Sequence, residues 1–306
     1  MPSGIEVVFL GTGGSLPTRE RGLPSVAIRR DGELLMFDCG EGTQRQMMHA
    51  GLGFNRATSI FISHLHGDHL LGLPGLLQTM SSLVRDKPLN IYGPKGLSSF
   101  FKSLHGTLGF AAAFPVRINE LRPGDKVERA DYQVRTTLAK HDITCLAYAM
   151  EEKVRPGHFN PDIARRLGVP EGPLWKELQY GKSVQVDGKV IEAKRVTGPI
   201  RPGLKVTYAI DTRPCQNVRQ LAKRSDLLMH DGGFALDRKE KAREYFHSTA
   251  VEAASVAKTT KCRRLALVHI SAVTRDDRIL QNEARKVFPS TIVPKDLMVL
   301  SLKRSP

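Results

Sequence analysis

Short apolar runs rich in β-branched and aromatic residues recur along the whole chain, with helical patterns between them. The runs cover residues 6–10, 34–37, 59–62, 89–92, 134–137, 144–150, 205–210, 227–229, 265–268 and 297–302. One helical pattern places apolar side chains at Leu70, Leu73, Leu77, Met80 and Val84. Regular alternation of strands and helices restricts the chain to a layered α/β fold.

The length and composition predict one globular domain covering residues 1–306. A chain of 306 residues with 41% apolar residues can bury a sizeable core. It has no apolar run near the roughly 20 residues that cross a bilayer, and it opens on a strand-like run without a basic leader. Its four cysteines are far apart and form no C-x-x-C pair, which is typical of reduced thiols. We therefore expect a soluble, cytoplasmic protein.

A segment from 151 to 194 interrupts the alternation. It is rich in proline, glycine and charge, with breaks at 155–157 and 170–173, and a short helical pattern lies between them at 161–167. Such composition predicts an insertion that projects from the core.

The charge balance favours a polyanionic partner. The 46 Lys and Arg residues against 31 Asp and Glu give a net charge of +15. Among polyanions, nucleic acid is the first candidate and an anionic membrane surface the second, while solubility explains the charge alone equally well.

The segment from Ser63 to His69, directly after one apolar run, contains four candidate metal ligands. It reads Ser-His-Leu-His-Gly-Asp-His, and imidazole and carboxylate groups are ligands suited to Zn²⁺. His64 and His66 can converge on one ion from an extended backbone, while a following turn lets Asp68 and His69 face a second. Two metals about 3.5 to 4 Å apart can stabilise both the attacking and the leaving oxygen of a phosphoryl displacement.

Three further candidate ligands follow predicted strands. They are His141, Asp211 and His269. Taken alone, each of these residues is equally well explained as a helix or turn cap or as a surface group. They indicate metal ligands only because all three occur after the His-x-His-x-Asp-His motif.

Four more segments carry a family resemblance. They are Phe-Leu-Gly-Thr-Gly-Gly at 9–14, Phe-Asp-Cys-Gly-Glu-Gly-Thr-Gln at 37–44, Asp-Thr-Arg-Pro at 211–214 and His-Ser-Thr at 247–249. With the histidine motif, they make the chain resemble the short form of the ribonuclease Z family, within the metallo-β-lactamase superfamily. The resemblance implies an αββα sandwich with a protruding arm. It also implies a zinc-dependent endoribonuclease that removes the 3′ trailer from precursor tRNA and leaves a 3′-hydroxyl.

The resemblance assigns two Zn²⁺ per subunit to seven ligands. By this likeness His64, His66 and His141 hold one ion, Asp68, His69 and His269 hold the other, and Asp211 bridges them. A carboxylate suits the bridge because it is anionic, and neutral imidazoles suit the terminal positions. Asp38 is either a turn former or the group that orients a metal-binding histidine.

Two residues are predicted to take part in proton transfer. Asp68 is the candidate that orients or deprotonates the attacking water. His247 is similar to a family histidine that donates a proton or contacts phosphate. Thr249 and Glu252 form a T-x-x-E capping box, which predicts that a helix begins just after His247. Some relatives pair this histidine with an acid four positions before the bridging Asp. That position is Thr207 here, which predicts a relay that is either shortened or differently built.

The resemblance also gives the inserted segment a role. It implies an arm that grips tRNA in a homodimer, one subunit's arm serving RNA at the other's site. The basic candidates for this contact are Arg155, Arg165, Arg166 and Lys176, and Trp175 either packs the base of the arm or stacks on RNA.

Two other functions stay open at this point. One is a phosphodiesterase of the same superfamily that acts on cyclic nucleotides or other small phosphate esters. The other is an RNA-binding protein without activity, which a complete ligand set argues against. Segments 230–234 and 269–273 depart from the family pattern, so the substrate preference of an enzyme could be shifted.

Overall fold

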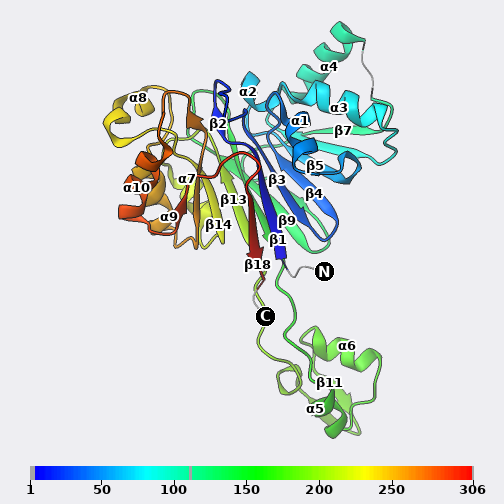
Figure 1. Ribbon diagram of the computed structural model, residues 1–306. Helices are drawn as coiled ribbons and strands as arrows, with labels where there is room; N and C mark the ends of the chain where they lie inside the picture. Colours follow the sequence, from blue (N-terminus) through cyan, green and yellow to red (C-terminus); the bar gives the residue numbers. More distant parts are fainter. Residues whose placement is uncertain (1–3, 110–111, 305–306) are drawn as a thin grey trace. The chain divides into compact units, whose positions relative to one another are not determined.

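Two seven-stranded sheets make up most of the molecule (Figure 1). The computed structural model describes residues 4–109 and 112–304. The chain divides into two compact units, one formed by residues up to 151 with 204–303, the other by 152–203 with residue 304. Within the described residues, no helix combines the length and apolar character needed to cross a membrane.

The first sheet takes its strands from the N-terminal half and the C-terminus. Its order is β18 (Val299–Lys303), β1 (Gly4–Gly11), β3 (Ser25–Arg30), β4 (Glu33–Phe37), β5 (Ala57–Phe61), β6 (Leu89–Gly93) and β7 (Val116–Glu120). From β4 to β7 all neighbours are parallel, whereas β1 is antiparallel to both β18 and β3.

The second sheet takes its strands from the rest of that unit. Its order is β17 (Thr291–Ile292), β15 (Leu265–Val268), β14 (Leu227–Asp231), β13 (Lys205–Ala209), β10 (Leu146–Glu152), β9 (Tyr132–Leu138) and β8 (Lys126–Glu128). Strands β13, β14, β15 and β17 are parallel, so the residues that follow them emerge at one edge. A two-residue pair, β2 (Gly13–Gly14) with β16 (Ile270–Ser271), ties the first β1 loop to the segment after β15.

Helices cover the outer face of each sheet (Figure 1). The first sheet carries α1 (Thr43–His49), α2 (Gly67–Leu70), α3 (Leu73–Ser82) and α4 (Leu97–Leu108). The second carries α7 (Gln216–Ala222), α9 (Ala250–Thr259) and α10 (Asp277–Val287), with α8 (Lys239–Glu244) before α9. Single 3-10 turns lie at Phe54–Arg56, Ala193–Arg195 and Leu236–Arg238.

The alternation of side chains along β1 shows how the layers form. Val7 and Phe9 join a buried cluster that contains strand residues of both sheets, so this core lies between them. Val8 and Leu10 point the other way, into a cluster with Leu73, Leu76 and other helix residues. A third cluster joins the second sheet to α7, α9 and α10. Strands buried on both faces explain the nearly continuous apolar runs of the sequence. The layers therefore run helix, sheet, sheet, helix, as predicted.

Each of the ten predicted strands is found, with ends shifted by a few residues. The helical pattern from Leu70 to Val84 is not one helix: α2 ends at Leu70, α3 begins at Leu73 and ends at Ser82. Val84 lies beyond the helix with a φ of 51° and 85% of its surface exposed. Its apolar character continued the pattern although its side chain does not join the core.

The second unit has a small core of its own. It holds α5 (Pro161–Arg166), α6 (Pro173–Gln179), β11 (Val184–Val186) and β12 (Lys189–Ile191). Buried apolar side chains from these elements form one cluster, among them Ala164, Leu178, Val184 and Ile191. The unit runs from 152 to 203, nine residues beyond the end expected from composition at 194.

Candidate metal centre and active site

Seven candidate ligands come together from loops that follow strands of both sheets. His64 and His66 lie between β5 and α2, and Asp68 and His69 lie on α2. His141, Asp211 and His269 follow β9, β13 and β15. Asp211 and His269 have φ angles of 45° and 58°, and such strained backbone on non-glycine residues is typical of functional sites.

One group of ligands surrounds one oxygen of Asp211. The Asp211 Oδ2 atom lies 3.6 Å from His64 Nε2 and 3.8 Å from His141 Nε2. His66 completes the group, its Nδ1 lying 3.0 Å from His64 Nε2 and 3.4 Å from His141 Nε2. The ligand atoms of these four residues all lie within 4.8 Å of one another.

A second group lies beside the first. Asp68 Oδ2 is 3.3 Å from His69 Nε2 and 3.6 Å from His269 Nε2. Asp211 reaches this group as well, because its Oδ1 atom lies 3.2 Å from His269 Nε2 and its Oδ2 atom 3.5 Å from His69 Nε2. Asp211 is thus the one carboxylate of the seven that contacts ligands of both groups.

Buried atoms without partners indicate that this cluster fits a divalent cation. His69 Nε2, His269 Nε2 and Asp211 Oδ1 are buried and find no hydrogen-bond partner among the described residues. Leaving such atoms unsatisfied is costly, and imidazole nitrogens with carboxylate oxygens are the donors that first-row divalent metals accept. The donor set therefore matches a divalent metal in chemistry and in position.

Asp38 fixes the orientation of His69 from beneath the cluster. Its Oδ2 atom lies 2.7 Å from His69 Nδ1 and accepts hydrogen bonds from Ser63 Oγ and the Tyr208 hydroxyl, both at 2.8 Å. Its Oδ1 atom accepts from the Ser63 amide at 2.7 Å. Asp38 is fully buried with a φ of 57°. The geometry turns His69 Nε2 toward the cluster.

The glycine loop after β1 also contacts the site. A Cβ atom on Gly14 would lie 2.5 Å from the His269 ring, so only glycine fits there. The next amide, of Ser15, donates a hydrogen bond to Asp68 Oδ2 at 2.9 Å. Burial raises the pKa of Asp68, but the adjacent His269 and His69 side chains outweigh it and hold the pKa well below its usual range. The carboxylate is therefore ionised at neutral pH.

His247 lies beside the cluster and pairs with an acid that the sequence did not single out. Its Nδ1 atom is 2.8 Å from Asp231 Oδ2, at the end of β14. Burial lowers the pKa of His247, but the charge of Asp231 outweighs it and raises the pKa to about 9. Thr207 instead contacts the Ser225 hydroxyl, away from His247. The partner acid comes from the neighbouring strand, which is the differently built relay that Thr207 indicated.

Two of the segments that carried the resemblance, 211–214 and 247–249, contact each other around His247. Arg213 donates to the His247 carbonyl at 2.6 Å and to Glu252 Oε2 at 2.8 Å. Glu252 accepts the Thr249 amide, and the Thr249 side chain accepts the Glu252 amide, so the predicted capping box is present and α9 begins at Ala250. The Asp231 carboxylate in turn accepts the Thr212 amide at 3.2 Å.

The cluster opens into a pocket of about 460 Å³. Five ligand candidates line it, namely His66, Asp68, His141, Asp211 and His269, and His247 lines it too. His64 and His69 are fully buried beneath. Asp142, another residue that the sequence did not single out, lines the pocket with its Oδ1 atom 2.8 Å from His141 Nε2.

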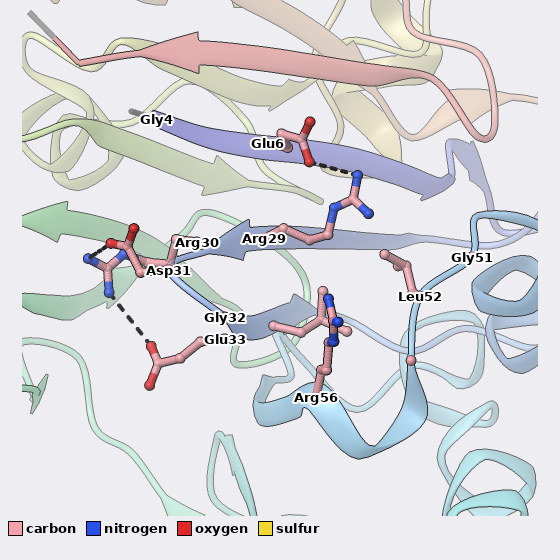
Figure 2. A pocket seen from close by; sticks show the side chains of 12 residues that line it. Gly4, Glu6, Arg29, Arg30, Asp31, Gly32, Glu33, Gly51, Leu52 and Arg56 are labelled. Atoms are coloured by element: carbon pink, nitrogen blue, oxygen red, sulfur yellow. Dashed lines mark hydrogen bonds and ion pairs between the residues drawn. The ribbon is translucent and has the colours of Figure 1, made fainter. Parts of the chain in front are cut away.

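A second hollow lies at the far ends of β1 and β3 (Figure 2). It holds about 290 Å³. Two pairs of its charged groups lie close together, with Arg29 at 2.7 Å from Glu6 and Arg30 at 3.7 Å from Glu33 (Figure 2). The ligand candidates lie at the other ends of these strands, so this hollow plays no part in the site.

The four basic candidates of the inserted segment all lie in the second unit. Arg165 pairs with Glu171 at 2.8 Å and with Asp162 at 3.0 Å, and Arg166 donates to the Asp162 carbonyl. The Arg155 and Arg201 backbones pair with each other, and Lys176 is exposed.

Trp175 packs within the same unit. Its Nε1 atom donates to the Val169 carbonyl at 3.0 Å, and its ring centroid lies 5.2 Å from that of Phe159. Of the two uses considered for this ring, packing is the one present.

Comparison with known proteins agrees with the fold and the cluster. A family model described as anti-Pycsar protein Apyc1 matches residues 5–146. A metallo-β-lactamase fold protein of Bacillus subtilis, YhfI, aligns over 98% of this chain and all of its own, with a TM-score of 0.72 and 17% identity. The short form of human tRNase Z aligns over 96% of this chain and 98% of its own, with a TM-score of 0.70 and 27% identity. The fold and the ligand cluster define a metal-dependent hydrolase with the metallo-β-lactamase fold.

Sequence identity narrows the class further. Ribonuclease Z of Methanosarcina acetivorans is 47% identical over 303 residues, which cover 99% of either chain. This chain therefore belongs to the ribonuclease Z family, and it is a phosphodiester-hydrolysing endoribonuclease.

Proposed function

We propose that this endoribonuclease removes the 3′ trailer from precursor tRNA with two zinc ions per subunit, leaving a 3′-hydroxyl on the tRNA. The observation that carries the proposal is the position of Asp211, whose carboxylate lies against ligands of both groups, His64 and His141 in one and His69 and His269 in the other. A bridging carboxylate between two cations is electrostatically favourable.

Each zinc ion has its own ligands in this proposal. His64, His66 and His141 would hold one ion, Asp68, His69 and His269 would hold the other, and Asp211 would be shared. Bound zinc supplies Lewis-acid stabilisation of phosphate oxygens and makes water a competent nucleophile near neutral pH. Asp38 keeps His69 aimed at its ion through the 2.7 Å contact to Nδ1.

Two side chains handle protons. Asp68 orients or deprotonates the attacking water, and its ionised state and the Ser15 amide fix the carboxylate for that task. His247 is protonated at neutral pH because of Asp231, so it can donate to the leaving oxygen. His247, Asp231, Asp211 and His269 also lie within 4.8 Å of one another, so metal analysis of a His247 variant separates proton donor from ligand.

The inserted segment binds RNA and does no chemistry in this proposal. It folds around its own core, as expected of a binding module that can vary apart from the catalytic centre. Among the four basic candidates, Lys176 and Arg166 are exposed and can contact phosphate, whereas Arg165 is held by two acids. We further propose a cytoplasmic homodimer in which one subunit's arm serves the other's site.

Product mapping on a precursor tRNA tests the proposal. Purified protein is incubated with a precursor tRNA labelled at either end, and with an unstructured RNA of equal length as the control. One cut directly 3′ of the discriminator nucleotide, with a 3′-hydroxyl on the tRNA and no cut in the control, is expected. Cleavage at many positions in both RNAs, or hydrolysis of 3′,5′-cyclic nucleotides alone, contradicts it.

A further inference from the structure

The short helix α8 ends in an unusual residue. Tyr245 caps it, the Phe246 amide donates to the Arg243 carbonyl at 3.3 Å, and the His247 amide donates to the Ala242 carbonyl at 2.7 Å. This is the Schellman pattern, in which the left-handed residue is usually glycine because a Cβ atom is crowded there. Here that residue is Phe246, with a φ of 60°.

Backbone strain alone does not single out Phe246. Val84 occupies the same position after α3, since its amide donates to Ser81 and the next amide donates to Met80, with a φ of 51°. What distinguishes Phe246 is its place. It lines the pocket of the candidate metal centre and directly precedes His247 in the chain.

The pocket around Phe246 carries more exposed apolar surface than phosphate binding requires. Tyr245 is 55% exposed and Phe246 37% exposed, and both line the pocket with Asp68 and His269. The exposed side chains of Leu16 and Val273 line it as well. A phosphate needs donors and cations, whereas a nucleobase presents a flat π face that stacks on aromatic rings.

We propose that Phe246, assisted by Tyr245, is the stacking platform for one of the two nucleobases that flank the scissile phosphate. The inference rests on the proposed function, because it needs an RNA bound at the metal centre. The Schellman turn fixes the Phe246 backbone next to that of His247, so a base stacked on the ring is held at a set distance from His247. Phe246 is thus a positioning residue that favours RNA over small phosphodiesters.

Replacing Phe246 with glycine separates this role from a structural one. The change relieves the left-handed strain, which offsets part of the stability lost with the mostly buried ring, and the melting temperature is measured to show that the variant folds. We expect kcat/KM for precursor tRNA to fall about tenfold or more, the usual scale for loss of one stacked base. Zinc content should not change, and turnover of methyl p-nitrophenyl phosphate, which has no nucleobase and a single ring, should fall far less than cleavage of precursor tRNA. Phe246→Trp should restore cleavage, and Phe246→Leu should not.

Val84→Gly is the matched control, because it makes the same backbone change at the end of α3. It should leave cleavage of precursor tRNA unaltered. An abasic nucleotide on one side of the cut should slow the wild type and have no further effect on Phe246→Gly.

Three results would decide against the platform. They are unchanged cleavage by Phe246→Gly, equal loss on RNA and on the small diester, or no abasic effect at either flanking position. A wild-type protein that leaves precursor tRNA intact overturns the proposed function itself, and this inference with it.

Discussion

Individual residues in this site are held by contacts that the motif does not reveal. The sequence indicated His64, His66, Asp68 and His69 because their spacing is rare in a chain with 10 histidines. It could not indicate Asp231, since the acid that pairs with His247 depends on β13 and β14 lying side by side. The sequence could not indicate Ser15 either, because it contacts Asp68 through its backbone amide and not through its side chain.

Asp68 gives the sharpest prediction at this scale. Replacing it with alanine should lower kcat on precursor tRNA by about 10²-fold or more, because the group that positions or deprotonates the water is lost. Asp68→Asn keeps the shape and serves as the comparison. The number of zinc ions bound per chain is measured in parallel. A fully active Asp68→Ala enzyme with two bound metals would show that Asp68 does not orient or deprotonate the water.

The Asp231 and His247 pair predicts a pH effect. Asp231 raises the pKa of His247 to about 9, so the proton on His247 is retained up to that pH and kcat should fall above it. Asp231→Asn removes the negative charge and lowers the pKa of His247. The fall of kcat on the alkaline side of the pH profile should therefore move to lower pH. His247→Ala should abolish the limb and lower kcat at unchanged zinc content. Loss of one zinc in His247→Ala would show that it is a ligand.

Single elements set the spacing between ligands. The two-residue pair of β2 with β16 places Gly14 against the His269 ring, which explains why a glycine stands at this position. Other element boundaries were readable in advance. The capping box at Thr249 gave the start of α9, whereas Val84 extended an apolar pattern past the end of α3. Local hydrogen-bond chemistry is visible in a sequence, but burial is decided by packing.

Gly14→Ala tests this element. The added methyl would lie 2.5 Å from the His269 ring, so the ring must move. We expect zinc affinity and cleavage to fall about 10- to 100-fold, the usual cost of disturbing a group that orients a metal ligand. Gly106→Ala, where an added Cβ meets no atom within 4 Å and φ is not positive, controls for the change from glycine to alanine itself. Wild-type zinc affinity in Gly14→Ala would contradict this prediction, since it would mean that the loop moves aside without displacing His269.

The molecule as a whole separates a catalytic unit from a smaller unit with its own core. The order of strands within a sheet could not be predicted from the sequence, because neighbours in a sheet can be far apart in the chain. Strand β1 at the start of the chain, for example, pairs with β18 at its end. The layer order was implied by the family resemblance. Residues 195–203 contain two Pro, two Gly and two Arg, so they continue the composition of 151–194, and the second compact unit ends at 203.

Excising the second unit tests its role in RNA binding. Arg155 and Arg201 pair through both backbone hydrogen bonds, at 2.9 and 3.0 Å, so residues 156–200 can be replaced by an Asn-Gly turn. KM for precursor tRNA should rise steeply while hydrolysis of bis(p-nitrophenyl) phosphate stays nearly intact. Charge reversal at Lys176 gives a milder version without deletion. An equal loss of activity on both substrates would show instead that the second unit supports the structure of the active site.

The central claim is that two metal ions in the seven-ligand cluster cut precursor tRNA, and a metal titration tests it most directly. Metal-free protein is reconstituted with zinc in fractions of an equivalent, and bound zinc and the rate of cleavage 3′ of the discriminator nucleotide are measured on the same samples. The account predicts that the rate rises until two zinc ions are bound per chain, and that Asp211→Asn fails to reach that state. Full cleavage with one ion, or with none, would contradict it.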